Sequence, residues 1–165
     1  MLSSDILNYL DQYGPLLVFV IMFLEALNLT GIPSYIILPA IGFFIEQSPF
    51  SFLFILVMTL LGSISGCLLY YIVARKFGRS MYNYFYQKFP LAKRGLDKAS
   101  ELSERYGAMM CFTGRIIPTV RVFISLMSGV FQIPFKTYLI YSAAGITVWN
   151  FITLFIGYLT ALYSS

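Results

Sequence analysis

Three charged residues lie within otherwise apolar stretches of the 165-residue chain, namely Glu25, Arg115 and Arg121. An arginine at the centre of a bilayer costs on the order of 2.5–3.5 kcal/mol on insertion scales, so it must face protein, water or a bound partner. One carboxylate cannot neutralise two guanidinium groups, and a guanidinium fork matches the oxygens of a phosphate. We predict that these three residues bind the phosphate of a lipid headgroup. The alternative for Glu25 is a purely structural ion pair with one arginine.

Glycine and proline interrupt both stretches that carry these charges. The first contains Thr30-Gly31-Ile32-Pro33, and the second contains Thr113-Gly114 followed by Pro118. On a straight helix Arg115 and Arg121 would point about 240° apart, because each residue turns the helix by about 100°. A break at Pro118 lets the backbone fold so that both side chains reach one cavity. The residues expected to line it are Pro33, Ser34, Tyr35, Gly114 and Pro118, with Trp149 and Asn150 as further candidates; Trp149 fits a core position equally well.

The composition indicates a membrane protein. Hydrophobic residues make up 59% of the chain and charged residues 11%, and there is no histidine. A soluble domain carries about 25% charged residues, so this chain cannot cover a soluble surface. The length leaves no room for a separate catalytic domain, and no catalytic or nucleotide-binding motif is present. We therefore expect no enzymatic activity, no nucleic-acid binding, no metal site and no cofactor, with Cys67 and Cys111 as small core residues.

Helical segments account for the whole length and predict an all-α polytopic membrane fold. Segments that are apolar but broken predict re-entrant helical hairpins, since neither half is long enough to span a bilayer. Uninterrupted apolar segments predict full transmembrane helices. The expected segments are an interfacial helix at 1–14, a first re-entrant hairpin at 15–45, a transmembrane helix at 48–74, a basic amphipathic segment at 75–107 that includes an interfacial helix, a second re-entrant hairpin at 108–133 and a transmembrane helix at 136–162.

The order of these segments predicts an inverted repeat, because a broken segment followed by a full span occurs twice. In that topology residues 75–107 and Lys136 lie on one face of the membrane and contain nine of the eleven basic residues. The positive-inside rule makes that face cytoplasmic and places both termini on the opposite side.

The motif Gly114-Arg115-Ile116-Ile117-Pro118-Thr119-Val120-Arg121, followed by Gly129, Gly145 and Trp149, resembles the DedA family, which carries the SNARE-associated or VTT domain. The first half is similar as well, at Glu25, Ile32-Pro33-Ser34 and Leu38-Pro39-Ala40-Ile41-Gly42. The resemblance covers nearly the whole chain. It implies a multi-pass protein of the bacterial cytoplasmic membrane that moves lipids between leaflets, as a flippase or scramblase. Undecaprenyl phosphate and phospholipids such as phosphatidylethanolamine are the substrates it implies, and it assigns functional positions to Glu25, Arg115 and Arg121.

Two positions depart from the family's pattern. Tyr35 and Cys67 stand where the family usually has acidic residues, which leaves Glu25 as the intramembrane carboxylate able to carry a proton. Lipid flipping without proton coupling is therefore the leading expectation. Two other functions stay open: a proton-coupled exporter of small cations or drugs, which the two arginines disfavour, and a structural protein that organises membrane partners. The expected partners are lipids with anionic or phosphate headgroups, and a homo-oligomer is compatible with the sequence.

Overall fold

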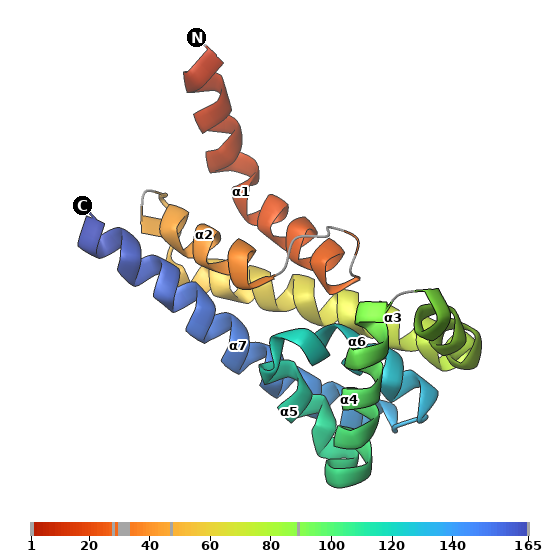
Figure 1. The fold of residues 1–165 in the computed structure, drawn as a ribbon. Helices are drawn as coiled ribbons and strands as arrows, with labels where there is room; N and C mark the ends of the chain where they lie inside the picture. The colour runs from red at the N-terminus through yellow and green to blue at the C-terminus, as the bar shows by residue number, and fades with distance from the viewer. Residues whose placement is uncertain (1, 28, 30–33, 47, 89, 165) are drawn as a thin grey trace. The chain divides into compact units, whose positions relative to one another are not determined.

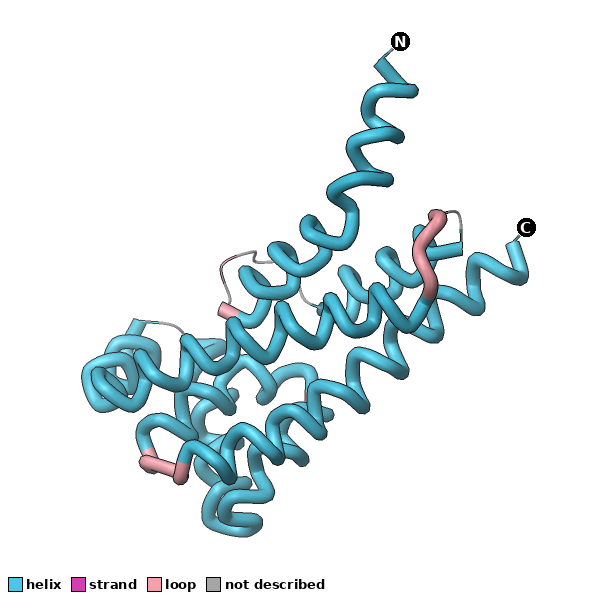
Figure 2. The backbone as a smooth tube through the Cα atoms, turned by 180° about the vertical axis from the view of Figure 1, so that it is seen from behind, coloured by secondary structure: helices cyan, strands magenta, loops and turns pink. Residues whose placement is uncertain are grey.

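The chain folds almost wholly into helices. The computed structural model describes residues 2–27, 29, 34–46, 48–88 and 90–164. These residues form α-helices and one short 3-10 helix, and they contain no strand (Figures 1 and 2). The elements are α1 (Leu2–Ala26), α2 (Ser34–Glu46), α3 (Phe52–Lys88), α4 (Pro90–Tyr106), the 3-10 helix η1 (Gly107–Met109), α5 (Met110–Ile116), α6 (Pro118–Val130) and α7 (Phe135–Ser164). The all-α fold expected from the sequence is confirmed.

Among the described residues, two helices are long and apolar enough to cross a membrane. The candidate spans are Phe52–Gly78 in α3 and Phe135–Tyr163 in α7, at the places where the sequence predicts full spans. The element boundaries differ from the sequence segments in two places. α3 continues past Gly78 to Lys88, so the basic segment begins as an extension of that helix. α1 is one helix that includes Pro15 and joins the segment expected at the interface to the first half of the first hairpin.

The chain divides into two compact units, each containing part of both long helices. The first unit is Met1–Ser63 with Asn150–Ser165, and the second is Ile64–Trp149. The first unit therefore holds α1, α2, the N-terminal part of α3 and the C-terminal part of α7. The second holds α4, α5, α6 and the remaining parts of α3 and α7.

Close helix packing in the first unit depends on glycine. A Cβ atom at Gly157 of α7 would collide with the backbone of Pro39 in α2, and one at Gly42 of α2 would collide with the backbone of Leu154 in α7. A Cβ atom at Gly62 of α3 would lie 2.5 Å from a carbonyl oxygen of α1. Small residues of this kind let helix backbones approach one another within a membrane.

Replacement of Gly157 by alanine is therefore expected to destabilise the first unit. Overpacking of this kind typically lowers the free energy of unfolding by about 1–3 kcal/mol, which a thermal-unfolding measurement in detergent would record as a lower Tm. Gly14→Ala is the matched control, because its Cβ atom would lie 3.7 Å from the Phe50 ring, an ordinary contact. An unchanged Tm for Gly157→Ala would contradict the close approach of α2 and α7.

The second unit is assembled by the same kind of contact. A Cβ atom at Gly129 of α6 would lie 2.6 Å from the Cβ atom of Ala74 in α3. A Cβ atom at Gly145 of α7 would lie 3.0 Å from the Cβ atom of Arg115 in α5. The helix α6 therefore packs closely on α3, and α5 packs closely on α7.

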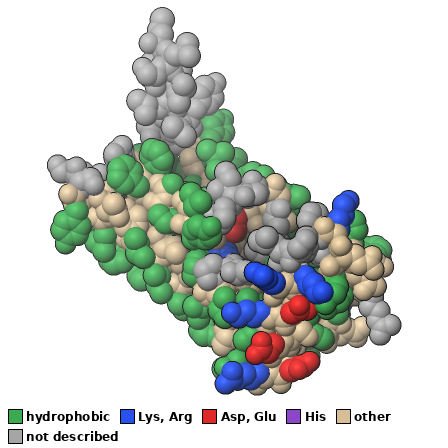
Figure 3. All heavy atoms as spheres, viewed as in Figure 1, with side chains coloured by type: hydrophobic (Ala, Val, Ile, Leu, Met, Phe, Trp, Pro, Cys, Tyr) green, Lys and Arg blue, Asp and Glu red, His purple; other side chains and the backbone are tan. Residues whose placement is uncertain are grey.

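The apolar side of α4 is covered by protein. Leu96 and Ala99 are fully buried, and the Gly95 backbone lies against the ring of Phe123 in α6. The charged residues of α4 are exposed, and Figure 3 shows lysine, arginine and acidic side chains gathered over this helix. The apolar side of the amphipathic basic segment thus packs on α6, and its position at the membrane interface stays a prediction.

The two units use corresponding helices in the same way. In the first unit α1 packs on α3 and α2 packs on α7; in the second, α5 packs on α7 and α6 packs on α3. The glycines that follow the two sequence breaks, Gly42 and Gly129, both lie at these contacts. An inverted repeat would produce this exchange of partners. The repeat itself and the re-entry of the hairpins into the membrane stay predictions.

Candidate functional site

The helix is broken between the two arginines, as Pro118 predicts. Arg115 lies in the last turn of α5, which ends at Ile116, and α6 begins at Pro118. Ile117 has an extended backbone, with φ −91° and ψ 112°, because a proline ring disfavours the helical conformation of the residue before it. The two arginines therefore project from different helices, and the angular separation expected on a straight helix does not apply.

Arg115 is enclosed in the second unit, with 3% of its surface exposed. Its guanidinium donates hydrogen bonds to side chains of three helices. Nη1 donates to Sγ of Cys67 at 3.0 Å, and Nη2 donates to Oγ of Ser125 at 3.0 Å, to Oη of Tyr138 at 3.0 Å and to Oγ of Ser142 at 3.3 Å. The arginine side chain thus joins α5 to α3, α6 and α7.

The hydroxyl of Tyr138 fixes this arrangement. It donates a hydrogen bond to the backbone oxygen of Cys67 at 3.0 Å and lies 2.9 Å from Oγ of Ser125. Its ring is fully buried and stacks on the ring of Tyr71, with ring centroids 4.2 Å apart. These hydrogen bonds and the stacked ring hold the guanidinium in one place.

The partners of Arg115 leave its charge without compensation. They are one thiol and three hydroxyls, and none of them is a carboxylate. The Nε atom is also buried and donates to no atom of the described residues. Burial of an ion from water is unfavourable by several kcal/mol unless an opposite charge repays it. The site is therefore suited to an anion.

Arg121 faces the same helix as Arg115. Its guanidinium carbon lies 5.3 Å from the centroid of the Trp149 ring, within the range of a cation–π interaction. The residues of α7 that meet the two arginines, at 138, 142, 145 and 149, are three or four positions apart and so share one helix face. Two arginines from different helices therefore lie against successive turns of one face of α7.

Glu25 lies in the first unit, in α1, with 7% of its surface exposed. Its pairing with an arginine stays a prediction. Ser34 is buried at the start of α2, whereas Tyr35 is exposed. Pro33 lies outside the described residues.

The other residues expected at the site have structural contacts. Gly114 is buried, and a Cβ atom there would collide with the side chain of Ile124 in α6, so this glycine allows α5 and α6 to meet. Asn150 is fully buried in the first unit, where its Nδ2 donates to Oγ of Ser63 at 3.3 Å. Trp149 lies under Arg121. That these residues line one cavity stays a prediction.

Most of the groups that contact Arg115 are not among the residues predicted for the site. Cys67 was expected to be a core residue, and it is buried with a free thiol, but its sulfur also accepts a hydrogen bond. Ser125, Tyr138 and Ser142 carry no charge and match no motif. A signal was present, because Tyr138 and Ser142 lie four residues apart in an apolar span, where polar side chains on one face indicate a function.

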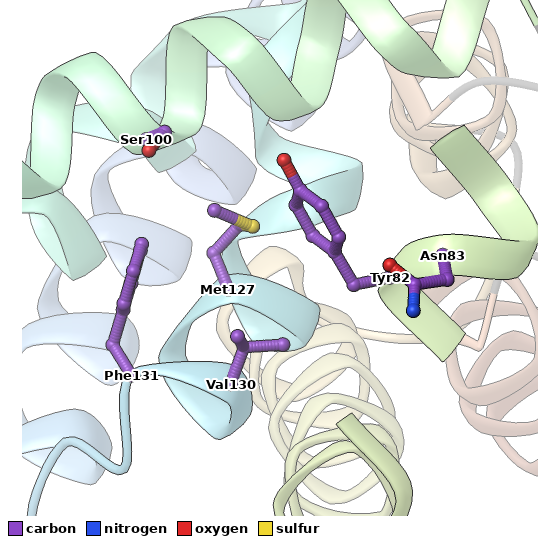
Figure 4. Close-up of a pocket in the computed structure, with 6 residues that line it drawn as sticks. All are labelled: Tyr82, Asn83, Ser100, Met127, Val130 and Phe131. Carbon is purple, nitrogen blue, oxygen red and sulfur yellow. The ribbon is translucent and has the colours of Figure 1, made fainter. Parts of the chain in front are cut away.

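A separate pocket of about 400 Å³ opens in the second unit, lined by Tyr82, Asn83, Ser100, Met127, Val130 and Phe131. Figure 4 shows the Tyr82 hydroxyl directed toward α4 and the Phe131 side chain on the opposite side of Met127. Burial, together with nearby Tyr86 and Asp97, raises the pKa of Tyr82, so the hydroxyl stays protonated near neutral pH. None of the residues predicted for the headgroup site lines this pocket.

Comparisons with known proteins agree with the membrane character of the chain. A family model described as the VTT domain matches residues 32–159. The uncharacterized membrane protein YbfM of Bacillus subtilis is 26% identical over 88% of this chain and 90% of that protein. Undecaprenyl phosphate transporter A of Staphylococcus aureus is 28% identical over 94% of this chain and 78% of that protein. The protein of the same name from Bacillus subtilis is 24% identical over 94% of this chain and 76% of that protein. No solved structure matches the chain significantly.

Proposed function

Because the chain belongs to the family of proteins with a VTT domain, the DedA family, we propose that it moves lipids with a phosphate headgroup between the leaflets of a bacterial cytoplasmic membrane. Two relatives that match most of the chain are named as undecaprenyl phosphate transporters. Undecaprenyl phosphate and phosphatidylethanolamine both contain a phosphate group, and the protein would recognise either lipid by binding that group.

The observation that carries the proposal is the buried guanidinium of Arg115 with only neutral partners. A phosphate oxygen is a charged acceptor, and charge-assisted hydrogen bonds are roughly twice as strong as neutral ones. A lipid phosphate near Arg115 would therefore supply the missing counter-charge. Arg121 lies against the same face of α7 and would bind another part of the headgroup.

The second unit also has an exposed apolar surface that lipid tails could contact. Ile140 and Val148 of α7 and Ile72 and Val73 of α3 are exposed in the second unit. Apolar side chains exposed along a candidate span face lipid in a membrane. The headgroup would thus occupy the arginine site while the tails stay in the hydrocarbon layer.

In the proposed topology, neither α5 nor α6 crosses the membrane. The helices α5 and α6 have 7 and 13 residues, each short of the about 20 residues needed to cross a bilayer. They enter and leave on one side. The apolar parts of α1 and α2, Tyr13–Ala26 and Ser34–Ile45, are likewise short and enter and leave on the other side. Exposed basic residues of the α3 extension and α4 then mark the cytoplasmic face.

The test measures headgroup dependence in vesicles. The purified chain is reconstituted into phosphatidylcholine vesicles, and dithionite quenching follows the flipping of a fluorescent phosphatidylethanolamine. A fluorescent glucosyl diacylglycerol with the same chains is the matched lipid, because its polar headgroup lacks a phosphate. We expect the protein to accelerate flipping of the phosphate lipid at least about tenfold more, since a charge-assisted hydrogen bond contributes about 1.5–3 kcal/mol.

Added undecaprenyl phosphate distinguishes the two lipid sources. If it slows the flipping of the phospholipid, the two lipids share the site; if it does not, the phospholipid is the substrate of this chain. Equal acceleration of both fluorescent lipids would contradict recognition of the phosphate. No acceleration of either fluorescent lipid over protein-free vesicles would contradict phospholipid translocation.

A further inference from the structure

We propose that Arg75 is a third phosphate-binding residue for the same lipid, separated from Arg115 by the stacked rings of Tyr71 and Tyr138, which close the path between the two arginines. The inference rests on the proposed function. It adds Arg75 to the residues that bind the phosphate, and it adds a contact that must change when the lipid moves.

Three residues of α3 lie on one face of the helix. Cys67, Tyr71 and Arg75 are spaced four residues apart, which places them one above another along the helix. Cys67 contacts the guanidinium of Arg115, and Arg75 lies near the end of the candidate span Phe52–Gly78. Eight residues of helix rise correspond to about 12 Å, so this face leads from the buried arginine toward the basic side.

The two tyrosines are held by matching sets of hydrogen bonds. The Tyr71 hydroxyl accepts from Nη1 of Arg75 at 2.5 Å and donates to the backbone oxygen of Ile133 at 2.6 Å. The Tyr138 hydroxyl accepts from Nη2 of Arg115 at 3.0 Å and donates to the backbone oxygen of Cys67 at 3.0 Å. Each tyrosine hydroxyl therefore contacts one arginine and one carbonyl, and that of Tyr138 also lies 2.9 Å from Oγ of Ser125.

The contacts form one continuous series from the surface to the buried site. Arg75 lies 5.9 Å from the centroid of the Tyr71 ring, and Arg115 lies 5.9 Å from the centroid of the Tyr138 ring. The two rings are stacked with centroids 4.2 Å apart, and their residues are 1% and 0% exposed. A headgroup that moved along this series of contacts from one arginine to the other would displace the ring pair.

Binding of a phosphate supplies the reason for the displacement. A tyrosine hydroxyl is a neutral acceptor, whereas a phosphate oxygen is a charged acceptor. The phosphate oxygen therefore competes with the hydroxyl for the same guanidinium donors. When the phosphate binds Arg75 or Arg115, the tyrosine loses the arginine that fixes it. The ring pair then opens only when an anion is bound at one of its ends. Arg75 is available for this step, because it is exposed, whereas Arg115 is enclosed.

The experiment compares Arg75→Gln with Lys76→Gln, which removes the same charge from the next residue. Lys76 is exposed and its Nζ lies over the Phe77 ring, 5.6 Å from the centroid. Flipping of fluorescent phosphatidylethanolamine is measured in phosphatidylcholine vesicles. We expect Arg75→Gln to lower the flipping rate about tenfold or more, as for loss of a charged hydrogen bond, and Lys76→Gln to leave it within about twofold.

A second measurement separates binding from structural damage. Trp149 is the chain's one tryptophan and lies beside Arg121, so its fluorescence reports titration of the inner site with dihexanoyl phosphatidic acid. We expect Arg75→Gln to leave the Kd of this titration unchanged while the flipping rate falls.

Three results would overturn the inference. They are a wild-type flipping rate for Arg75→Gln, equal losses for Arg75→Gln and Lys76→Gln, and a loss of Trp149 titration in Arg75→Gln. Failure of the inference can be told from failure of the proposed function. If Arg115→Gln stops flipping and Arg75→Gln does not, the inference alone fails; if wild-type protein does not flip lipid, the proposed function fails and the inference with it.

Discussion

Arg115→Gln is expected to reduce lipid flipping to the rate of protein-free vesicles while the protein still folds. The glutamine amide can form only some of the hydrogen bonds that Arg115 donates to Ser125, Tyr138 and Ser142. It also has no positive charge to attract a phosphate. The same substitution removes an ion buried among neutral groups, which offsets the lost hydrogen bonds. We expect the free energy of unfolding to change by no more than about 2 kcal/mol.

Two measurements check this expectation. Dithionite quenching gives the flipping rate, and thermal unfolding in detergent gives the Tm. Arg94→Gln is the matched control, since it makes the same change at an exposed position of α4. Arg115→Lys retains the charge but not the planar fork, so we expect an intermediate rate. Normal flipping by Arg115→Gln would show that the buried guanidinium does not bind the substrate.

Arg121→Gln is expected to lower the flipping rate about tenfold or more, with little change in Tm. Its guanidinium lies over Trp149 at 5.3 Å, and a cation–π contact of this kind is worth about 0.5–2 kcal/mol. That contact orients the charge, but a phosphate would bind the guanidinium far more strongly than the ring does. Removal of the charge should therefore affect transport more than folding.

Variants at Trp149 separate the two contributions. Trp149→Phe keeps an aromatic face under Arg121 and should flip lipid at close to the wild-type rate. Trp149→Leu removes the aromatic ring under Arg121 but leaves the charge of Arg121 in place. The flipping rate should therefore fall by less than in Arg121→Gln. If Trp149→Leu stopped flipping while Arg121→Gln did not, the aromatic ring rather than the arginine would bind the headgroup.

Local features of the sequence were sufficient to predict the fold class and one break. An 11% content of charged residues indicates a membrane protein, and unbroken apolar stretches predict the two candidate spans. Pro118 predicts the interruption between α5 and α6, because proline disfavours the helical conformation of the residue before it, although α1 and α2 continue through Pro15 and Pro39. The buried arginine was also predictable, since a charge in an apolar stretch must be enclosed or paired.

The extent of individual helices was less predictable. α3 continues to Lys88, although the apolar stretch ends earlier. Hydropathy reports where a helix leaves the hydrocarbon layer and not where its backbone hydrogen bonds stop. The amphipathic pattern of α4 likewise does not identify what covers its apolar side, which in this fold is α6.

The scarcity and position of the charges were determined by the sequence alone, and they direct attention to Arg115 and Arg121. Only the tertiary structure determined what surrounds them. The Arg115 guanidinium is met by Cys67 from α3, Ser125 from α6 and Tyr138 from α7, which are 10 to 48 residues away in the chain. Local propensity and hydropathy act over one or two helical turns. The neutral side chains around Arg115 come together because glycines let α3, α5, α6 and α7 approach closely.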